Sequence, residues 1–124
     1  MSTVLIVEDN DKNMKLARDV LQVKGYQTLE AVTGEQGVEL AKEKTPDLVL
    51  MDIQLPGISG IEAFKQLRAD PRTARIPVVA LTASVTPTDR SQITAAGFDA
   101  FVSKPISLKE FLDTVKRLVE AAKE

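Results

Sequence analysis

Acidic side chains stand at the ends of two apolar, strand-like runs of this sequence. Glu8 and Asp9 end the run that begins at residue 3, and Asp52 follows the apolar run 48–51. Carboxylates that are crowded together repel one another, so such a cluster usually implies a bound cation or a raised proton affinity. The pattern therefore predicts a site for a cation that prefers oxygen ligands, such as Mg²⁺.

A hydroxyl and an ammonium group follow two further strand-like runs. The run 77–82 ends at Thr82, and the run 100–103 leads into Lys104 and Pro105. Carboxylates, a hydroxyl and an ammonium together are the groups that Mg²⁺-assisted phosphoryl chemistry needs, because that chemistry depends on positioning and on stabilising negative charge. Each of these residues alone is more often a turn former or a cap, so the hypothesis depends on their convergence.

Alternating strand and helix patterns must position these groups. Short aliphatic runs alternate with 3.6-residue periodicities, which predicts five strands, at 3–8, 27–32, 47–51, 77–82 and 100–103, and five helices, at 12–24, 34–44, 60–69, 87–96 and 107–122. The alternation predicts an α/β fold, a doubly wound five-stranded parallel sheet with helices on both faces. Ligands of such open sheets bind beyond the carboxyl ends of the strands, where the residues named above are expected to meet.

Composition narrows the class of protein. The chain has 124 residues, enough for one domain with a single core, and its net charge of −2 argues against nucleic acid as the main partner. It contains no histidine and no cysteine, which excludes disulfides, thiolate metal sites, a histidine base and histidine-ligated zinc. There is no apolar run of membrane-spanning length and no signal segment, so the expected location is the cytoplasm.

Four segments together resemble the receiver domain of two-component response regulators. They are VLIVEDN at 4–10, PDLVLMDIQLP at 46–56, PVVALTA at 77–83 and VSKPI at 102–106. The resemblance covers the whole chain and implies a flavodoxin-like sheet with strand order 2-1-3-4-5. Asn10 and the segments 13–16, 51–56 and 103–107 resemble in particular the stand-alone, cell-division regulators of that family, which implies a single receiver domain over 1–124 without an output domain.

The resemblance also implies roles for the acidic residues. Asp52 matches the residue that accepts a phosphoryl group from the phosphohistidine of a partner. Asp9 and Asp52, with Glu8 acting through water, match the Mg²⁺ ligands, and the backbone carbonyl of Gln54 matches a further ligand. No other cofactor is implied.

Further matches concern the residues after the fourth and fifth strands. Thr82 and Lys104 match the groups that hold the phosphoryl oxygens. Phe101 matches an aromatic that changes rotamer when Thr82 moves, although plain core packing explains an aromatic on a short strand equally well. The peptide bond between Lys104 and Pro105 is expected to be cis, as in the family.

The chemistry of the residues agrees with these roles. Without metal, the cluster of three acids and one amine would repel an incoming phosphoryl group, and with Mg²⁺ bound it would be close to neutral. Asp52 could then attack as a carboxylate nucleophile, without a general base, and form an aspartyl phosphate. Phosphorylation adds charge and acceptor oxygens, and the hydroxyl of Thr82 could move inward to bond them. Phe101 would fill the space that Thr82 vacates, and the change would reach the surface formed by the last two helices.

The expected partners follow from the family. The donor would be a sensor histidine kinase or a histidine phosphotransfer protein, and a downstream protein would dock on the face made by 87–96, 100–103 and 107–122. Neither nucleic acid nor membrane insertion is expected, and the chain is expected to be a monomer or weak dimer. The protein is interpreted as a signalling protein rather than an enzyme, catalysing only its own phosphorylation and dephosphorylation.

Three alternatives remain open. The first is a protein with the receiver fold that binds partners without being phosphorylated. A phosphatase of the haloacid-dehalogenase type also uses an aspartate after a strand, but it needs a second acid two residues on, where this chain has Gln54. A flavodoxin-like cofactor carrier needs a phosphate-cradling loop after the first strand, and here that loop is the acidic segment 8–11.

Overall fold

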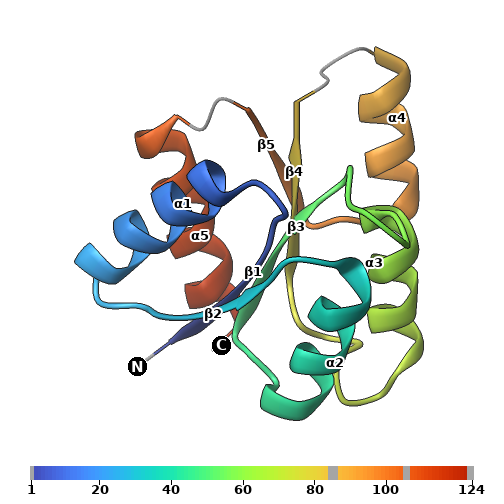
Figure 1. Ribbon diagram of the computed structural model, residues 1–124, viewed down its shortest axis with the longest axis horizontal. Coiled ribbons are helices and arrows are strands. Elements are labelled where there is room, and N and C mark those ends of the chain that lie inside the picture. Colours follow the sequence, from blue (N-terminus) through green and yellow to red (C-terminus); the bar gives the residue numbers. More distant parts are fainter. Residues whose placement is uncertain (1, 84–86, 105–106, 123–124) are drawn as a thin grey trace.

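Strands and helices alternate along the chain as the sequence predicts. The computed structural model describes residues 2–83, 87–104 and 107–122 (Figure 1). The strands are β1 Thr3–Val7, β2 Gln27–Ala31, β3 Leu48–Asp52, β4 Val78–Thr82 and β5 Ala100–Ser103. The helices are α1 Asp11–Val23, α2 Gly34–Lys44, α3 Gly60–Ala69, α4 Pro87–Ala96 and α5 Leu108–Ala122.

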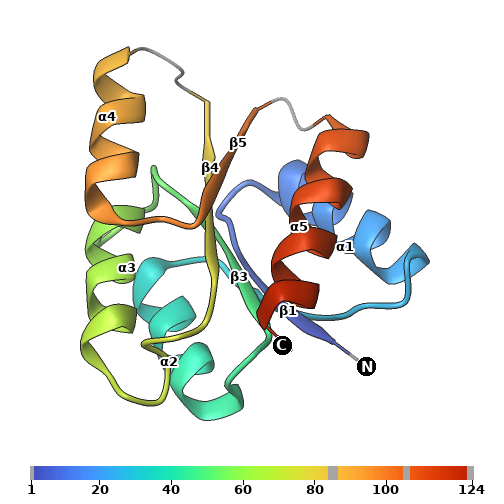
Figure 2. The same cartoon turned by 180° about the vertical axis from the view of Figure 1, so that it is seen from behind.

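The strands form one parallel sheet in the order β2-β1-β3-β4-β5. Helices α1 and α5 cover one face of the sheet, and α2, α3 and α4 cover the other (Figures 1 and 2). The predicted α/β fold and its strand order are thus confirmed. β1 and β3 pair in parallel, so their carboxyl ends lie side by side. The strand order reverses between these two strands, which is the position where open sheets bind ligands.

Burial on both faces explains why the central strands read as continuous apolar runs. All five residues of β3 and of β4 are buried, and the helices pack over them in two separate layers. Phe111 and Val115 of α5 lie in one layer, and Phe64 and Leu67 of α3 lie in the other. Burying each such side chain contributes roughly 1.5–3 kcal/mol. None of the helices in the described part of the chain is long and apolar enough to cross a membrane.

Side-chain caps fix where the helices begin. Asn10 accepts hydrogen bonds from the backbone N–H groups of Lys12 and Asn13 at 3.0 and 3.1 Å, so α1 begins at Asp11, one residue before the predicted start. Thr33 and Ser59 cap α2 and α3 in the same way, through Gln36 and Glu62, at 3.0 and 3.2 Å. Each such cap typically contributes about 1 kcal/mol.

Helix α3 begins in direct contact with the backbone of Asp52. A Cβ atom at Gly60 would lie 2.1 Å from the carbonyl oxygen of Asp52, and the Gly60 N–H donates to the carbonyl of Ile53 at 3.0 Å. Only glycine allows this approach, because any side chain would meet rigid backbone. The contact holds the end of β3 in place, and Asp52 with it.

Candidate functional site at the carboxyl edge of the sheet

Three carboxylates predicted from the sequence meet at the carboxyl edge of the sheet. One oxygen from each of Glu8, Asp9 and Asp52 lies within 4.8 Å of the others. The pairing of β1 with β3 produces this proximity, since Val7 lies opposite Met51 and the acids follow directly. Glu8 and Asp52 are 1% and 3% exposed, whereas Asp9 is exposed, so the cluster opens to solvent on one side.

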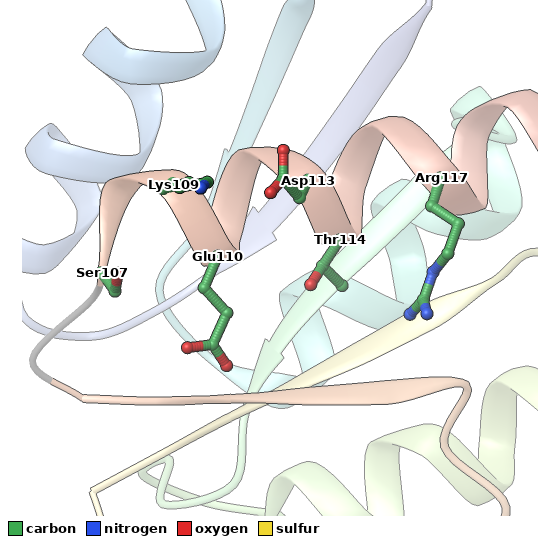
Figure 3. A pocket seen from close by; sticks show the side chains of 6 residues that line it. All are labelled: Ser107, Lys109, Glu110, Asp113, Thr114 and Arg117. Atoms are coloured by element: carbon green, nitrogen blue, oxygen red, sulfur yellow. The ribbon is translucent and has the colours of Figure 1, made fainter.

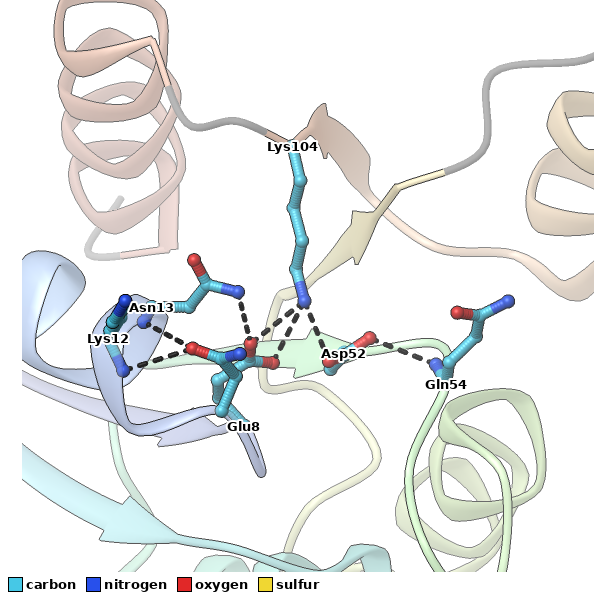
Figure 4. A network of polar contacts seen from close by, with 7 residues as sticks. Glu8, Lys12, Asn13, Asp52, Gln54 and Lys104 are labelled. Carbon is cyan, nitrogen blue, oxygen red and sulfur yellow. Dashed lines mark hydrogen bonds and ion pairs between the residues drawn. The ribbon is translucent and has the colours of Figure 1, made fainter.

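The amine of Lys104 reaches into this cluster from the end of β5. Its Nζ lies 2.8 and 3.1 Å from the two carboxylate oxygens of Glu8 and 2.8 Å from Oδ2 of Asp52 (Figure 4). The backbone N–H of Lys104 donates to the carbonyl of Thr82 at 2.8 Å, which continues the β4–β5 pairing and fixes the base of the side chain. One ammonium therefore bridges two buried acids that belong to different strands.

Two amide groups complete the first layer of contacts. The backbone N–H of Gln54 donates to Oδ1 of Asp52 at 2.9 Å, so both oxygens of Asp52 accept a hydrogen bond. The side-chain amide of Asn13 donates to Oε1 of Glu8 at 2.9 Å (Figure 4). Sequence reasoning did not identify Asn13 as a site residue. The available signal was a short amide in the first turn of the helix that follows the acidic pair.

Crowding and burial change the ionisation of the cluster. Burial, and next the neighbouring Asp52, raise the pKa of Glu8, while hydrogen bonds from Lys104 and Asn13 lower it, and the net result is a pKa of about 7. Burial of Lys104 disfavours its charged form, but its bonds to Asp52 and Glu8 outweigh that effect and raise its pKa. The amine therefore stays charged, but a single ammonium does not neutralise three carboxylates.

The donor set fits a hard divalent cation. The three side chains offer carboxylate oxygens, which Mg²⁺ prefers, and the exposed side of the cluster leaves room for the waters that Mg²⁺ retains. The pKa of Glu8 is raised mainly by burial and next by Asp52, so a cation at this position would favour the ionised form of Glu8 that the protein alone disfavours. These residues would hold the ion next to Asp52.

The remaining predicted residues lie at the same edge or close behind it. Thr82 is the last residue of β4, is 5% exposed, and pairs in register with Ser103. Phe101 lies within β5, is half-buried, and lines a cavity of about 500 Å³ together with residues of α4 and α5. Pro105 lies outside the described residues, and the expected cis bond with it.

A separate cavity of about 370 Å³ lies on the outer side of α5 (Figure 3). It contains none of the residues predicted to carry chemistry, and side chains of one helix supply nearly all of its wall. Its polar lining is a surface helix face and adds nothing to the acidic cluster. The lining residues are Ser107, Lys109, Glu110, Asp113, Thr114 and Arg117.

Comparison with known proteins finds relatives that match almost the whole chain. The family model described as the response regulator receiver domain matches residues 4–116. The polar-differentiation response regulator DivK of Brucella ovis is 46% identical over 114 residues, which cover 92% of this chain and 93% of that protein. DivK of Brucella anthropi matches to the same extent. The finer resemblance to a stand-alone regulator is thereby confirmed.

Solved structures support the same relationship. The signal receiver domain of a signal transduction histidine kinase from Syntrophus aciditrophicus has a TM-score of 0.92 and 30% identity, covering 100% of this chain and 94% of that chain. The receiver domain of sensor histidine kinase PA1611 from Pseudomonas aeruginosa PAO1 has a TM-score of 0.90 and 31% identity, covering 96% and 98%. The latter structure has a magnesium ion coordinated in its active-site cleft.

Proposed function

The chain belongs to the response regulator receiver domain family, and we propose from that premise that Asp52 accepts a phosphoryl group from a histidine kinase or a histidine phosphotransfer protein. The protein is a response regulator of two-component signalling. The assignment of Asp52 rests on its position. Asp52 is the buried carboxylate that ends the central strand, and it lies close to two other acids and one amine.

The same residues hold magnesium in this proposal. Glu8, Asp9 and Asp52 would bind the ion, with the backbone carbonyl of Gln54 as a further ligand. When bound, Mg²⁺ supplies positive charge that offsets the crowded carboxylates and the incoming phosphoryl oxygens. The support for this metal is the all-oxygen donor set and the magnesium in the related receiver domain of PA1611.

The chemical step requires little from the protein beyond placement. A carboxylate oxygen of Asp52 forms a bond to phosphorus while the bond between phosphorus and the donor's imidazole nitrogen breaks, and the electron pair returns to the imidazole. A carboxylate nucleophile has no proton to lose, so the step needs no general base. Lys104 is already 2.8 Å from Asp52, so a small movement of its ammonium would bring it to the phosphoryl oxygens.

Signalling would follow from the new charge at the end of β3. Phosphorylation of Asp52 replaces one negative charge with about two and adds three acceptor oxygens. Thr82 ends the neighbouring strand, and its hydroxyl would bind one of those oxygens. In this proposal Phe101 then turns into the space that is vacated, and the change reaches a docking face formed by α4, β5 and α5.

The receiver domain would act by binding other proteins. The alignment with DivK of Brucella ovis covers 93% of that protein, which is a regulator of similar length. The receiver domain would bind a downstream protein or pass the phosphoryl group on. Its chemistry would be limited to its own phosphorylation and dephosphorylation.

Mass spectrometry of the intact protein tests the proposal directly. Acetyl phosphate with Mg²⁺ should add the mass of one phosphoryl group, and the addition should disappear with chelator and in Asp52→Asn. Glu30→Gln, on the surface of β2, serves as the control variant and should be labelled normally. Labelling that persists in Asp52→Asn would show that another residue is the acceptor. A wild-type protein that takes no label would favour the phosphorylation-independent alternative.

A further inference from the structure

The side-chain amide of Asn13 makes a contact that the proposed chemistry does not use. Its Nδ2 donates to Oε1 of Glu8 at 2.9 Å, and the same oxygen accepts a hydrogen bond from Nζ of Lys104 at 2.8 Å. Glu8 is 1% exposed, so these donors take the place of water around that oxygen. Figure 4 shows them approaching Glu8 from different elements, Asn13 from α1 and Lys104 from the end of β5.

The two donors differ in how firmly they are held. Lys104 has a long, flexible side chain, and the proposed function draws its ammonium toward a phosphoryl group on Asp52. Asn13 has a short side chain on the first turn of α1. Its backbone N–H donates to Oδ1 of Asn10 at 3.1 Å, and the residue is half-buried. Asn13 therefore remains in place when Lys104 moves.

The Glu8 carboxylate determines which end of the Asn13 amide faces it. An ionised carboxylate only accepts hydrogen bonds, so the NH₂ group rather than the carbonyl oxygen must face Glu8. Without that donor, the Glu8 carboxylate would be free to turn once Lys104 has left. Such a turn would move a carboxylate oxygen out of the direction that the metal needs. Donors behind a metal ligand commonly fix its direction in this way.

We infer that Asn13 is a positioning residue, which holds the Glu8 carboxylate in the direction needed for Mg²⁺ throughout phosphorylation. The inference rests on the proposed function, because it assumes that Glu8 serves the metal and that Lys104 moves. It adds a residue to the site that acts on the ion only through Glu8.

A magnesium titration followed by NMR tests the inference without any phosphorylation assay. The backbone amide of Gln54 donates to Asp52, so its chemical shift reports on the site. Asn13→Ala should weaken the apparent Mg²⁺ affinity about tenfold, the lower end of the effect usual for such residues. Gln22→Ala is the matched control, because it also deletes one hydrogen bond that a side-chain amide of α1 donates, from Gln22 to the hydroxyl of Thr28 at 3.0 Å. Gln22 lies near the end of α1 that is far from the acids. The Mg²⁺ affinity of this control variant should equal that of the wild type.

The outcomes separate the inference from the proposed function. If Mg²⁺ does not shift the Gln54 amide in the wild type, the proposed metal site itself is wrong. If the wild type binds Mg²⁺ and Asn13→Ala binds it equally well, Asn13 is not a positioning residue. A second measurement follows the side-chain NH₂ protons of Asn13 with Mg²⁺ and beryllofluoride, a phosphoryl mimic. They should stay slow to exchange with solvent, and fast exchange there would contradict a contact that outlasts the movement of Lys104.

Discussion

The edges of the sheet at the amino ends and at the carboxyl ends of the strands carry acids that are hydrogen-bonded in different ways. At the amino edge, Asp47 accepts a hydrogen bond from the backbone N–H of Thr3 at 2.7 Å. Asp99 accepts from the backbone N–H of Val78 and from Arg68, both at 2.8 Å. At the carboxyl edge, Glu8 and Asp52 instead share one lysine.

The amino edge is also tied together by packing. The guanidinium of Arg68 donates to the carbonyl of Ile76 at 2.6 Å and lies 4.7 Å from the centre of the Phe64 ring. Phe64 in turn stacks on Phe98, with ring centres 4.2 Å apart. These contacts join α3, the start of β4 and the turn before β5. The acids at this edge therefore serve to hold the fold together.

The difference shows how a site can be distinguished from a structural polar network. At the amino edge, no donor is shared between the two acids, and their bonds join separate segments of the fold. At the carboxyl edge, two buried acids share one ammonium, and burial together with the neighbouring Asp52 raises the pKa of Glu8 to about 7. Such an arrangement lowers stability in the absence of a cation, which is typical of residues kept for function.

The largest effect is expected from Asp52→Asn at the carboxyl edge. The change keeps the shape of the side chain and removes the nucleophile, so labelling by acetyl phosphate should be abolished. The free energy of unfolding in chelator should not fall, because one of the crowded charges is gone. Urea titration beside the labelling assay measures both. A large loss of stability would mean that this edge is structural too.

The pH dependence of stability should show the second effect. The pKa of Glu8 is about 7 in the folded protein and 4.5 when unperturbed, so between these values the folded state binds more protons than the unfolded state. Stability without metal should therefore decrease as pH rises through this range, by about 1 kcal/mol per pH unit at most.

Thermal or urea unfolding in chelator, repeated across this pH range, measures that slope. In Glu8→Gln the slope should become much flatter, and saturating Mg²⁺ should reverse it in the wild type. An unchanged slope in Glu8→Gln would assign the titration to another group.

Asp99→Ala should have the opposite pattern at the amino edge. The backbone N–H of Val78 and the guanidinium of Arg68 would lose an acceptor, which should reduce the free energy of unfolding by about 2 kcal/mol. Labelling of Asp52 should continue at the wild-type rate under conditions where the variant is folded. Glu30→Ala, which breaks only the exposed pair with Arg18, is the control and should change stability by about 0.5 kcal/mol or less. Slower labelling in Asp99→Ala would show that the two edges are not independent.

The smallest effect on stability is expected from Asp70, which directly follows α3 near the amino edge of the sheet. Hydrogen bonds from the side chain and backbone of Arg72 lower the pKa of Asp70 to about 2 from 3.8. The unfolded state therefore binds protons first as the solution is acidified. The stabilisation is present above pH 3.8 and is lost as pH falls through about 2, the opposite sign to Glu8. Asp70→Asn should remove the part of the pH dependence of stability that lies between pH 3.8 and about 2, measured by urea unfolding at each pH, and an unchanged slope there would contradict the assignment.

Much of this arrangement was predictable because apolar periodicity sets the elements. The continuous runs of β3 and β4 predicted strands buried on both faces, and the carboxyl ends of parallel strands meet at one edge. Gly25 and Gly97, with φ of 89° and 100°, stand where the helical patterns stop. Individual side-chain contacts were not predictable, since periodicity carries no information on rotamers. The bond from Asn13 to Glu8 is one example, and the bridge from Lys104 to both acids is another.

The site forms only when β1 and β3 pair in their native register. Glu8 and Asp52 become neighbours only because Val7 lies opposite Met51, and a slip of one residue would turn every side chain of a strand to the other face. A chain whose first and third strands have not yet joined therefore has no place for the ion and no competent acceptor. Newly synthesised protein would not be phosphorylated until β1 and β3 have paired. Because magnesium would bind only the folded state, it would also increase the free energy of unfolding.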